Sequence, residues 1–513
     1  MTDNKQNNQN KRMIKNTLFL YFRMILTLSM TLYTSRLVLA ALGVNDYGIP
    51  NVVAGAVTMF AFMSGSMSSA TQRFLSYEQG KTKDNRTNDI FKMSLNIYVI
   101  IFFIVIIIAE TAGLWFINNK LTIPLDRLYA ANWAYQCAII SFGFTMIGIP
   151  YLASIISNEK MIAFAYISIF EVSFKLIAVI ILGANLGDNL IVYSVLLAII
   201  SALVWCLYYF FCRFQLSNTT YSFYWDDILF KKLLGFSGWN LIGNLSLIGM
   251  NQGVNILLNI FFGPAINATR AISSQVDIAI RGFSSNLQMS MNPLIIKSYA
   301  SKEYEYMHLL VFKGAKYSFF LLLFLTLPVL IKTEFILTLW LGTLPDKLII
   351  FCQLALIDSL IVSLSGTLVT AAQANGNIKY YQIFTGGVLL LNVPLSYLFF
   401  TLGAKPEVAI MVMIMVSITA LVVRLLFLKK MINLSIKKYF QIVLSKIFIV
   451  SLICIPTMFY ISHLMDKTFI DFLIQCTASS LLLIITIWSF GLDVSERKFI
   501  KEKVHSTLSK FKV

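Results

Sequence analysis

Apolar stretches long enough to cross a bilayer recur from one end of this 513-residue chain to the other. A membrane-spanning helix needs about 20 apolar residues, because its backbone groups must bond to one another across the hydrocarbon layer. The chain is 58% hydrophobic and 13% charged, whereas a soluble domain carries about 25% charged residues. These features predict an all-α polytopic membrane protein.

The pattern of apolar stretches predicts about fourteen transmembrane helices. They cover residues 16–42, 47–71, 90–116, 128–152, 161–183, 189–212, 235–262, 268–292, 313–331, 348–372, 379–402, 407–428, 441–462 and 468–491. The polar segment 1–15 lacks the short apolar core and small-residue cleavage site of a signal peptide. We therefore expect it to be a cytoplasmic tail.

Basic residues predict the orientation, because cytoplasmic loops are enriched in Lys and Arg. With the N-terminus inside, most of the 41 Lys and Arg lie in cytoplasmic segments, with clusters at 72–86, 297–316, 429–438 and 496–512. Both termini are then cytoplasmic. The net charge of +17 is explained by loops beside anionic lipid headgroups, and no nucleic-acid partner is expected.

The chain is predicted to consist of two six-helix lobes, at 16–212 and 235–428, joined by a cytoplasmic connector at 213–234. A helix pair at 429–491 and a basic cytoplasmic tail at 492–513 follow. The lobes show a weak repeat in which Gly43 falls opposite Gly263 and Ser76-Tyr77 falls opposite Ser298-Tyr299. Because both lobes start inside, such a repeat is parallel, with its axis along the membrane normal.

Several classes of chemistry have no support in the sequence. The six cysteines lie in or beside apolar spans and the three histidines are scattered, so we expect neither a disulfide framework nor a metal site. No GxxxxGK[ST] phosphate loop occurs, and no cofactor is predicted. The loops are too short to form a catalytic domain. A channel, a secondary transporter or a membrane scaffold remains.

Polar residues form stripes along several of the predicted spans, since successive helical residues are about 100° apart. The stripe in span 268–292 consists of Arg270, Ser274, Asp277, Arg281, Ser285, Gln288 and Asn292. In span 235–262 it consists of Asn240, Asn244, Asn251 and Asn255. Arg23 lies on the first span, and Arg73 lies at the cytoplasmic end of the second.

Charges in mid-bilayer cost at least about 2.5–3.5 kcal/mol each, so they normally face a protein interior or an aqueous cavity. We interpret the stripes as the wall of a hydrated, net-positive central cavity. A single intramembrane Ser or Asn can instead form a helix–helix hydrogen bond, and Asp277 with Arg281, or Glu171 with Lys175, can form a structural ion pair. Asp277, Glu171 and Asp358 are also candidates for ion coupling, with a structural role as the alternative for each.

Two stretches resemble a known family. "GSMSSATQRFLSYEQGK" (65–81) and "AAQANGNIKYYQIFTGGVLLLNVPLSYLFFTLGAKPE" (371–407) are similar to the polysaccharide (O-antigen or oligosaccharide repeat-unit) flippases of the multidrug/oligosaccharidyl-lipid/polysaccharide exporter superfamily. The resemblance extends over essentially the whole chain. It implies a V-shaped pair of lobes that alternates between inward-open and outward-open states.

The resemblance also implies a cargo, undecaprenyl-diphosphate-linked oligosaccharide, moved to the periplasmic leaflet of the bacterial inner membrane for surface polysaccharide synthesis. Membrane lipids, a polysaccharide polymerase and glycosyltransferases are the implied partners. In the related lipid II flippases, arginines on the first and eighth helices meet the lipid diphosphate. By helix and depth, the resemblance implies this role for Arg23 and Arg281, with Arg270 nearer the exported end.

The sequence therefore predicts a lipid-linked oligosaccharide flippase rather than an enzyme. Arginine suits a diphosphate because its guanidinium donates hydrogen bonds in pairs and stays charged, and the four asparagines offer hydrogen bonds to sugar hydroxyls. One alternative is a multidrug or cation extruder of the same superfamily, which needs a mainly acidic cavity. A membrane-embedded glycan polymerase or ligase needs a large exported loop, and a pure scaffold has no need of buried charges.

Overall fold

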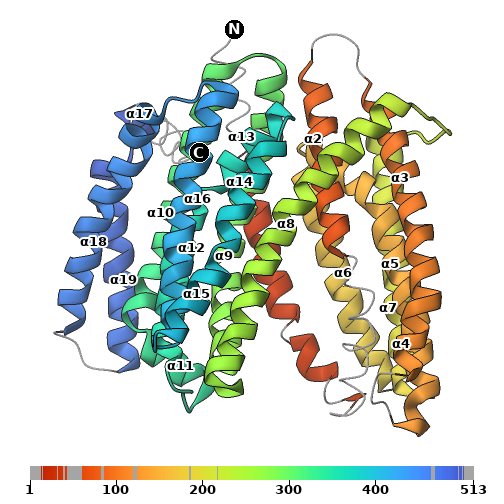
Figure 1. Cartoon of the computed structure of the whole chain (residues 1–513), viewed down its shortest axis with the longest axis horizontal. Coiled ribbons are helices and arrows are strands. Elements are labelled where there is room, and N and C mark those ends of the chain that lie inside the picture. The colour runs from red at the N-terminus through yellow and green to blue at the C-terminus, as the bar shows by residue number, and fades with distance from the viewer. Residues whose placement is uncertain are drawn as a thin grey trace, which may run out of the picture. The chain divides into compact units, whose positions relative to one another are not determined.

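The computed structural model describes residues 13, 15–31, 33–38, 41–42, 61–81, 86–119, 124–183, 187–216, 218–463, 468–494, 496–498 and 501. Every regular element in these ranges is a helix (Figure 1). Gly43, one position of the predicted repeat, lies outside the described residues.

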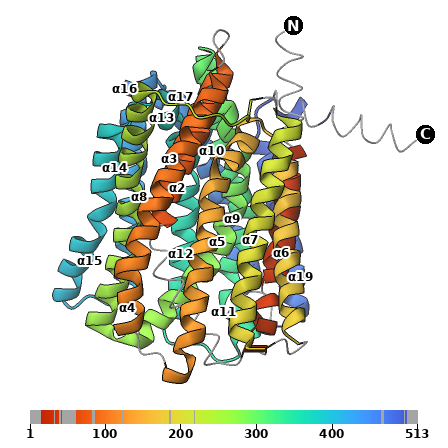
Figure 2. The same cartoon turned by 90° about the vertical axis from the view of Figure 1, so that its right-hand side faces the viewer.

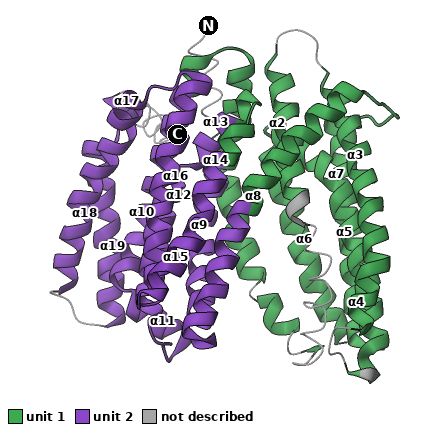
Figure 3. Ribbon diagram, in the orientation of Figure 1, with its two compact units in different colours: residues 1–245, 289–307, 373–383 green, residues 246–288, 308–372, 384–513 purple. Residues whose placement is uncertain are grey.

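The chain divides into two compact units (Figure 3). Unit 1 comprises residues 1–245, 289–307 and 373–383, and unit 2 comprises 246–288, 308–372 and 384–513. The division into two six-helix lobes at the connector 213–234 stays a prediction, because the boundaries of the two compact units do not fall at that connector. Five of the described helices have residues in both units: α8 (Asp227–Phe262), α9 (Pro264–Ala300), α10 (Tyr304–Ile331), α13 (Gly366–Asn375) and α14 (Lys379–Leu390).

Unit 1 is organised around one long helix. Its helices are Lys15–Val38, α2 (Ala61–Gly80), α3 (Thr87–Ile108), α4 (Leu114–Asn119), α5 (Leu128–Ser157), α6 (Met161–Leu182) and α7 (Asn189–Gln215). α5 packs against α2, α3, α6 and α7 (Figure 2). Leu75, Phe91 and Ile155, from α2, α3 and α5, are fully buried in this packing.

A carboxylate and a guanidinium fix the start of α7. Asp188 accepts hydrogen bonds from the backbone N–H groups of Leu190 and Ile191 and is the N-cap of the helix. Arg127 donates to the same carboxylate, with 2.6 Å between Nη1 and Oδ2. The hydrogen bond from Arg127 lowers the pKa of Asp188 below its usual value, because it stabilises the charged form.

Unit 2 has its core between α12 (Leu348–Ser363) and α16 (Val408–Ile432). Its other helices are α11 (Thr333–Leu341), α15 (Asn392–Thr401), α17 (Ile436–Tyr439), α18 (Ser445–His463) and α19 (Phe469–Thr486), with α13 (Gly366–Asn375) reaching into unit 1 at its last residues. α18 and α19 pack side by side (Figure 1). They expose large apolar side chains such as Phe448, Leu452 and Leu481, as lipid-facing helices do.

A buried ionic cluster ties the C-terminal region to α10. The ammonium of Lys316 is fully buried and lies 2.8 Å from a carboxylate oxygen of Glu496 and 3.4 Å from one of Asp493. Lys446, at the start of α18, also pairs with Asp493. The predicted helix pair at 429–491 is therefore fixed to unit 2 by charges from three segments.

The predicted helix count agrees with the fold. Twelve helices among the described residues are long and apolar enough to cross a membrane. The other two predicted spans, 47–71 and 268–292, correspond to α2 and α9, the helices whose sequences are rich in Ser, Asn, Gln and charged residues. The protein is a multi-pass membrane protein in which two polar helices accompany the twelve apolar ones.

Candidate functional site

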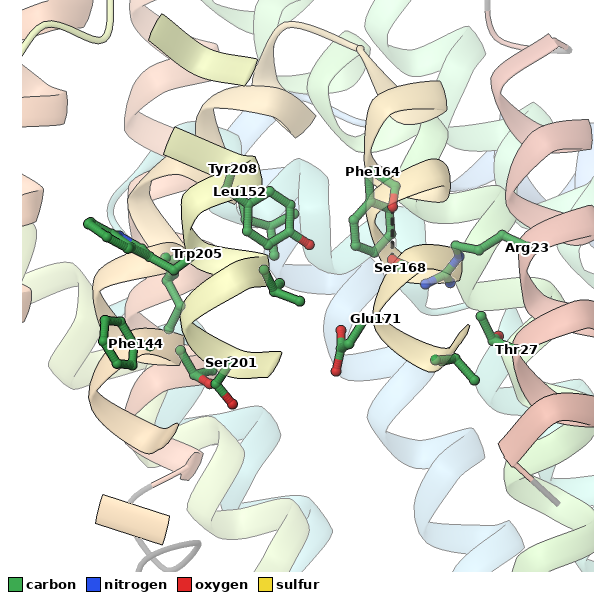
Figure 4. Close-up of a pocket in the computed structure, with 15 residues that line it drawn as sticks. Arg23, Thr27, Phe144, Leu152, Phe164, Ser168, Glu171, Ser201, Trp205 and Tyr208 are labelled. Carbon is green, nitrogen blue, oxygen red and sulfur yellow. Dashed lines mark hydrogen bonds between the residues drawn. The ribbon is translucent and has the colours of Figure 1, made fainter. Parts of the chain in front are cut away.

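Arg23 lines a pocket inside unit 1. The pocket has a volume of about 390 Å³ and lies between the helix Lys15–Val38 and α5, α6 and α7. Figure 4 shows Arg23 reaching toward α6 while Trp205 and Tyr208 of α7 stand on the other side. The guanidinium carbon of Arg23 lies 4.6 Å from the ring centroid of Phe164, a cation–π distance. The pocket therefore combines one cation with an aromatic lining.

Glu171 is the acidic residue that lines this pocket. Its Oε1 lies 2.6 Å from Nζ of Lys175, one turn further along α6. This is the ion pair that the sequence spacing allowed. When all three are ionised, Arg23, Glu171 and Lys175 together carry one net positive charge.

Arg73 lies at the C-terminal end of α2 and contacts the end of α13. Its Nε and Nη2 donate hydrogen bonds to the backbone carbonyls of Gln373 and Ala374, at 3.1 Å and 3.0 Å. The residue is 7% exposed. Carbonyls in the last turn of a helix lack intrahelical partners, and the helix dipole favours a cation there. Arg73 is thus a side-chain cap for α13 in this structure, and its guanidinium is largely shielded from solvent.

Two of the predicted asparagines also hold unit 1 together. Asn240 accepts hydrogen bonds from Gln382 at 2.8 Å and from Gln373 at 3.3 Å. Asn244 donates to the hydroxyl of Ser66 on α2, at 2.8 Å. These contacts are the helix–helix hydrogen bonds that formed the alternative explanation for isolated polar residues in the membrane.

Asn251 and Asn255 lie further along α8, in unit 2. Asn251 donates to the carbonyl of Leu247 in its own helix and is exposed. Asn255 donates to the side chain of Gln252. Of the four asparagines, these two keep their amides within reach of a ligand.

In unit 2, Arg281 joins α9 to α12. Its Nε donates to Asp277 Oδ1 at 2.8 Å, one turn back along α9, and to Ser359 Oγ at 2.9 Å. Its Nη2 donates to Asp358 Oδ2 on α12 at 2.7 Å. The side chain of Asp358 is 3% exposed and that of Arg281 is 31% exposed. Arg281 therefore has two carboxylate partners and still presents part of its surface.

Two serines complete this cluster. Ser359 donates a hydrogen bond to Asp277, and Ser417 of α16 donates to Asp358 Oδ1 at 2.6 Å. Neither serine was among the predicted site residues, because neither lies on the polar stripe of α9. Ser359 directly follows Asp358 in the sequence, but its contact with Asp277 and the contact of Ser417 with Asp358 depend on helix packing.

Arg270 lies two turns before Asp277 on the same helix and is 6% exposed. Its Nη2 lies 3.7 Å from the sulfur of Met413, one turn before Ser417 on α16. The structure therefore places Arg270 close to the cluster of Arg281, Asp277 and Asp358. These four residues carry equal numbers of positive and negative charges when all are ionised.

The structure is similar to solved structures of MATE transporters. The outward-facing conformation of a multidrug resistance MATE family transporter of the MOP superfamily aligns with a TM-score of 0.72 and 11% identity, over 83% of this chain and 96% of that chain. A MATE in its straight conformation gives the same values. A third structure is a MOP superfamily transporter from Pyrococcus furiosus, described as having a binding pocket of reverse polarity. It aligns with a TM-score of 0.67 and 11% identity, over 82% of this chain and 96% of that chain.

The chain has the fold of the MATE family transporters. No family model matches the sequence, and no curated protein matches it significantly. At this level of identity the likeness concerns the fold and not the cargo. Within the described part of this MATE-like fold, no three His, Cys, Asp or Glu side chains gather in a way that could hold a metal ion.

Proposed function

We propose that this MATE-like protein is a flippase for undecaprenyl-diphosphate-linked oligosaccharide in the bacterial inner membrane, with both termini in the cytoplasm. The observation that carries the proposal is the charge balance of the pocket in unit 1. Arg23 and Glu171 line this pocket, and together with Lys175, which pairs with Glu171, they carry one net positive charge. A cavity with a net positive charge favours an anion such as a lipid diphosphate over a cationic drug.

The proposed roles of the other residues follow from their exposure. Arg281 keeps about a third of its side chain accessible (31%), so a diphosphate can compete with Asp277 and Asp358 for its guanidinium. Asn251 and Asn255 offer hydrogen bonds to sugar hydroxyls from unit 2. Arg73, Arg270, Asn240 and Asn244 are engaged mainly with protein atoms in this structure, and we assign them supporting roles.

The alternative is a multidrug or cation extruder, which the likeness to a multidrug resistance MATE transporter favours. The polarity of the pocket argues against it, because an acidic residue must remain unpaired to attract a cation. The neighbour from Pyrococcus furiosus, described as having a pocket of reverse polarity that suggests a different function, supports variation of the cargo within this fold.

The membrane potential is the energy source that the cargo's charge suggests. A diphosphate carries about two negative charges, each worth about 2.3 kcal/mol per 100 mV. Outward movement is then downhill when the cytoplasm is negative. Proton coupling through Glu171, Asp277 or Asp358 is a second route, although each of these carboxylates has a basic partner in the structure.

Reconstitution into proteoliposomes tests the proposal. Wild-type protein should flip a fluorescent undecaprenyl-diphosphate oligosaccharide, and an imposed potential should change the rate. Arg23→Ala should lower the rate about tenfold, the equivalent of about 1.4 kcal/mol, while Arg36→Ala, an exposed arginine on the same helix, should not. Export of cationic dyes without lipid flipping would establish the alternative instead.

A further inference from the structure

The end of α2 forms a compact junction with two distant parts of the chain. We define this junction as Arg73, Tyr77, Tyr299 and the segment Gln373–Gly376. Besides the two hydrogen bonds of Arg73, the amide of Asn375 donates to the Tyr299 hydroxyl at 2.9 Å. The rings of Tyr77 and Tyr299 lie 6.4 Å apart. All of these residues belong to unit 1.

The junction is shaped to receive the guanidinium. Gly376 has φ +88°, a conformation that only glycine adopts without strain. A Cβ at this position would lie 2.5 Å from Nη2 of Arg73. Nearby, a Cβ on Gly80 would lie 2.5 Å from the carbonyl oxygen of Lys297. Two glycines therefore allow α2 to approach the ends of α13 and α9 closely.

The two stretches that carry the family resemblance meet here. Arg73 and Tyr77 belong to 65–81, and Gln373–Gly376 belongs to 371–407. Tyr77 and Tyr299 are also the paired positions of the predicted repeat. Residues related by a two-fold axis contact one another only at that axis, so their ring contact lies where a parallel repeat would have its axis.

The chemistry of the contact allows it to open. Arg73 bonds to neutral carbonyls, which hold a guanidinium less strongly than a carboxylate does. The segment 373–383 continues at both ends into unit 2. The contact of Arg73 with Gln373 and Ala374 therefore joins α2 to a segment that leads into unit 2. A contact of this moderate strength can form and break reversibly.

We propose that Arg73 is a latch. It holds α2 and the end of α13 together at the side of the protein predicted to be cytoplasmic, and it must release the α13 carbonyls each time cargo loads. This inference rests on the proposed transport function. It makes Arg73 a positioning residue for loading rather than a wall of the cargo site.

The first test measures opening without cargo. In a protein whose six native cysteines are replaced, Ala374→Cys reports on the junction because Ala374 is 0% exposed. The probe is a membrane-impermeant maleimide added to inside-out vesicles. Arg73→Ala should raise the labelling rate about tenfold, as expected for the loss of a charge-assisted hydrogen bond. Arg73→Lys should recover part of the protection.

Gly376→Ala provides a second variant that leaves Arg73 intact, in case Arg73→Ala does not fold. It should also speed labelling, because its methyl group displaces the guanidinium. Two controls match these changes. Gly403→Ala introduces a side chain at a similar φ of +82° with no atom within 4 Å, and Arg86→Ala removes an exposed arginine. If Arg73→Ala and Gly376→Ala label no faster than these controls, the latch is overturned.

The second test closes the latch permanently. The variant Tyr77→Cys with Tyr299→Cys is cross-linked with a short bis-methanethiosulfonate reagent, and dithiothreitol removes the cross-link. Cross-linking should stop lipid flipping and reduction should restore it, while the single-cysteine proteins treated alike should be unaffected. Undiminished flipping by the cross-linked protein would overturn the latch. If the reduced protein flips no lipid at all, the proposed function fails, while the labelling test still decides the latch.

Discussion

Arg73 and Arg281 are both arginines on polar helices, but the structure surrounds them differently. Arg281 in unit 2 has two carboxylate partners, Asp277 and Asp358, on two helices. Arg73 in unit 1 has two backbone carbonyls. An ion-paired cluster cannot lose one member without leaving a buried charge, whereas a carbonyl cap can open and leave only neutral groups. The same residue type therefore belongs to a charge-paired cluster in one unit and caps neutral carbonyls in the other.

Removing Arg281 should have the largest effect. Arg281→Ala leaves Asp277 and Asp358 without their shared partner, and breaking a buried pair in this way destabilises a protein by about 3–5 kcal/mol. We expect a large drop in the melting temperature of the detergent-solubilised protein. Little change in melting would show that the cluster is solvated and that the comparison with Arg73 is wrong.

A charge-balanced variant separates stability from transport at Arg281. Combining Arg281→Met with Asp277→Asn and Asp358→Asn should restore most of the melting temperature, because no unpaired charge remains. If this stable variant no longer flips lipid, the cluster takes part in transport as well as in stability. If it flips lipid at the wild-type rate, the cluster is structural.

Removing Arg73 should have a smaller effect on stability. Arg73→Ala deletes two hydrogen bonds to neutral carbonyls, but unlike the loss of Arg281 it leaves no buried charge without its partner. We expect its melting temperature to fall by less than that of Arg281→Ala, measured side by side in the same detergent. An equal or larger fall would mean that the junction is a rigid part of the core.

The smallest effect should come from the partly exposed ion pair of Asp188 and Arg127. The pKa of Asp188 is lowered in the folded protein, so its contribution is present above the unfolded value of about 3.9 and is lost as the pH falls through the folded value. The N-cap contributes about 1 kcal/mol. Between pH 7 and pH 3, the melting temperature of wild type should fall slightly more than that of Asp188→Asn. Equal falls would show that the charge of Asp188 does not contribute to stability.

The fold was largely predictable because lipid imposes simple rules. The apolar stretches indicate helices wherever about 20 such residues occur, and the polar stripe predicted in 268–292 lies on α9. The division of α8 and α9 between two units was not predictable. It depends on which residues of each helix pack together, and the helical period alone cannot show this.

The candidate site was predictable only in part. Spacing along one helix pointed to the pairs Asp277–Arg281 and Glu171–Lys175, since residues four apart share a face. Contacts between distant segments gave no sequence signal. The bond from Arg281 to Asp358, and the cap that Arg73 places on α13, depend on helix packing that periodicity does not encode.

The buried charge of Lys316 limits where the C-terminal region can be truncated or fused to a reporter. Its ammonium is fully buried against Glu496, a residue that lies beyond the last membrane-spanning helix. A chain shortened before Asp493 would leave that lysine with no counter-charge from the tail, so a twelve-helix version must also replace Lys316 with an apolar residue. The terminal segment is thus coupled to α10 through its charges, and a reporter fused here should follow Glu496 rather than precede it.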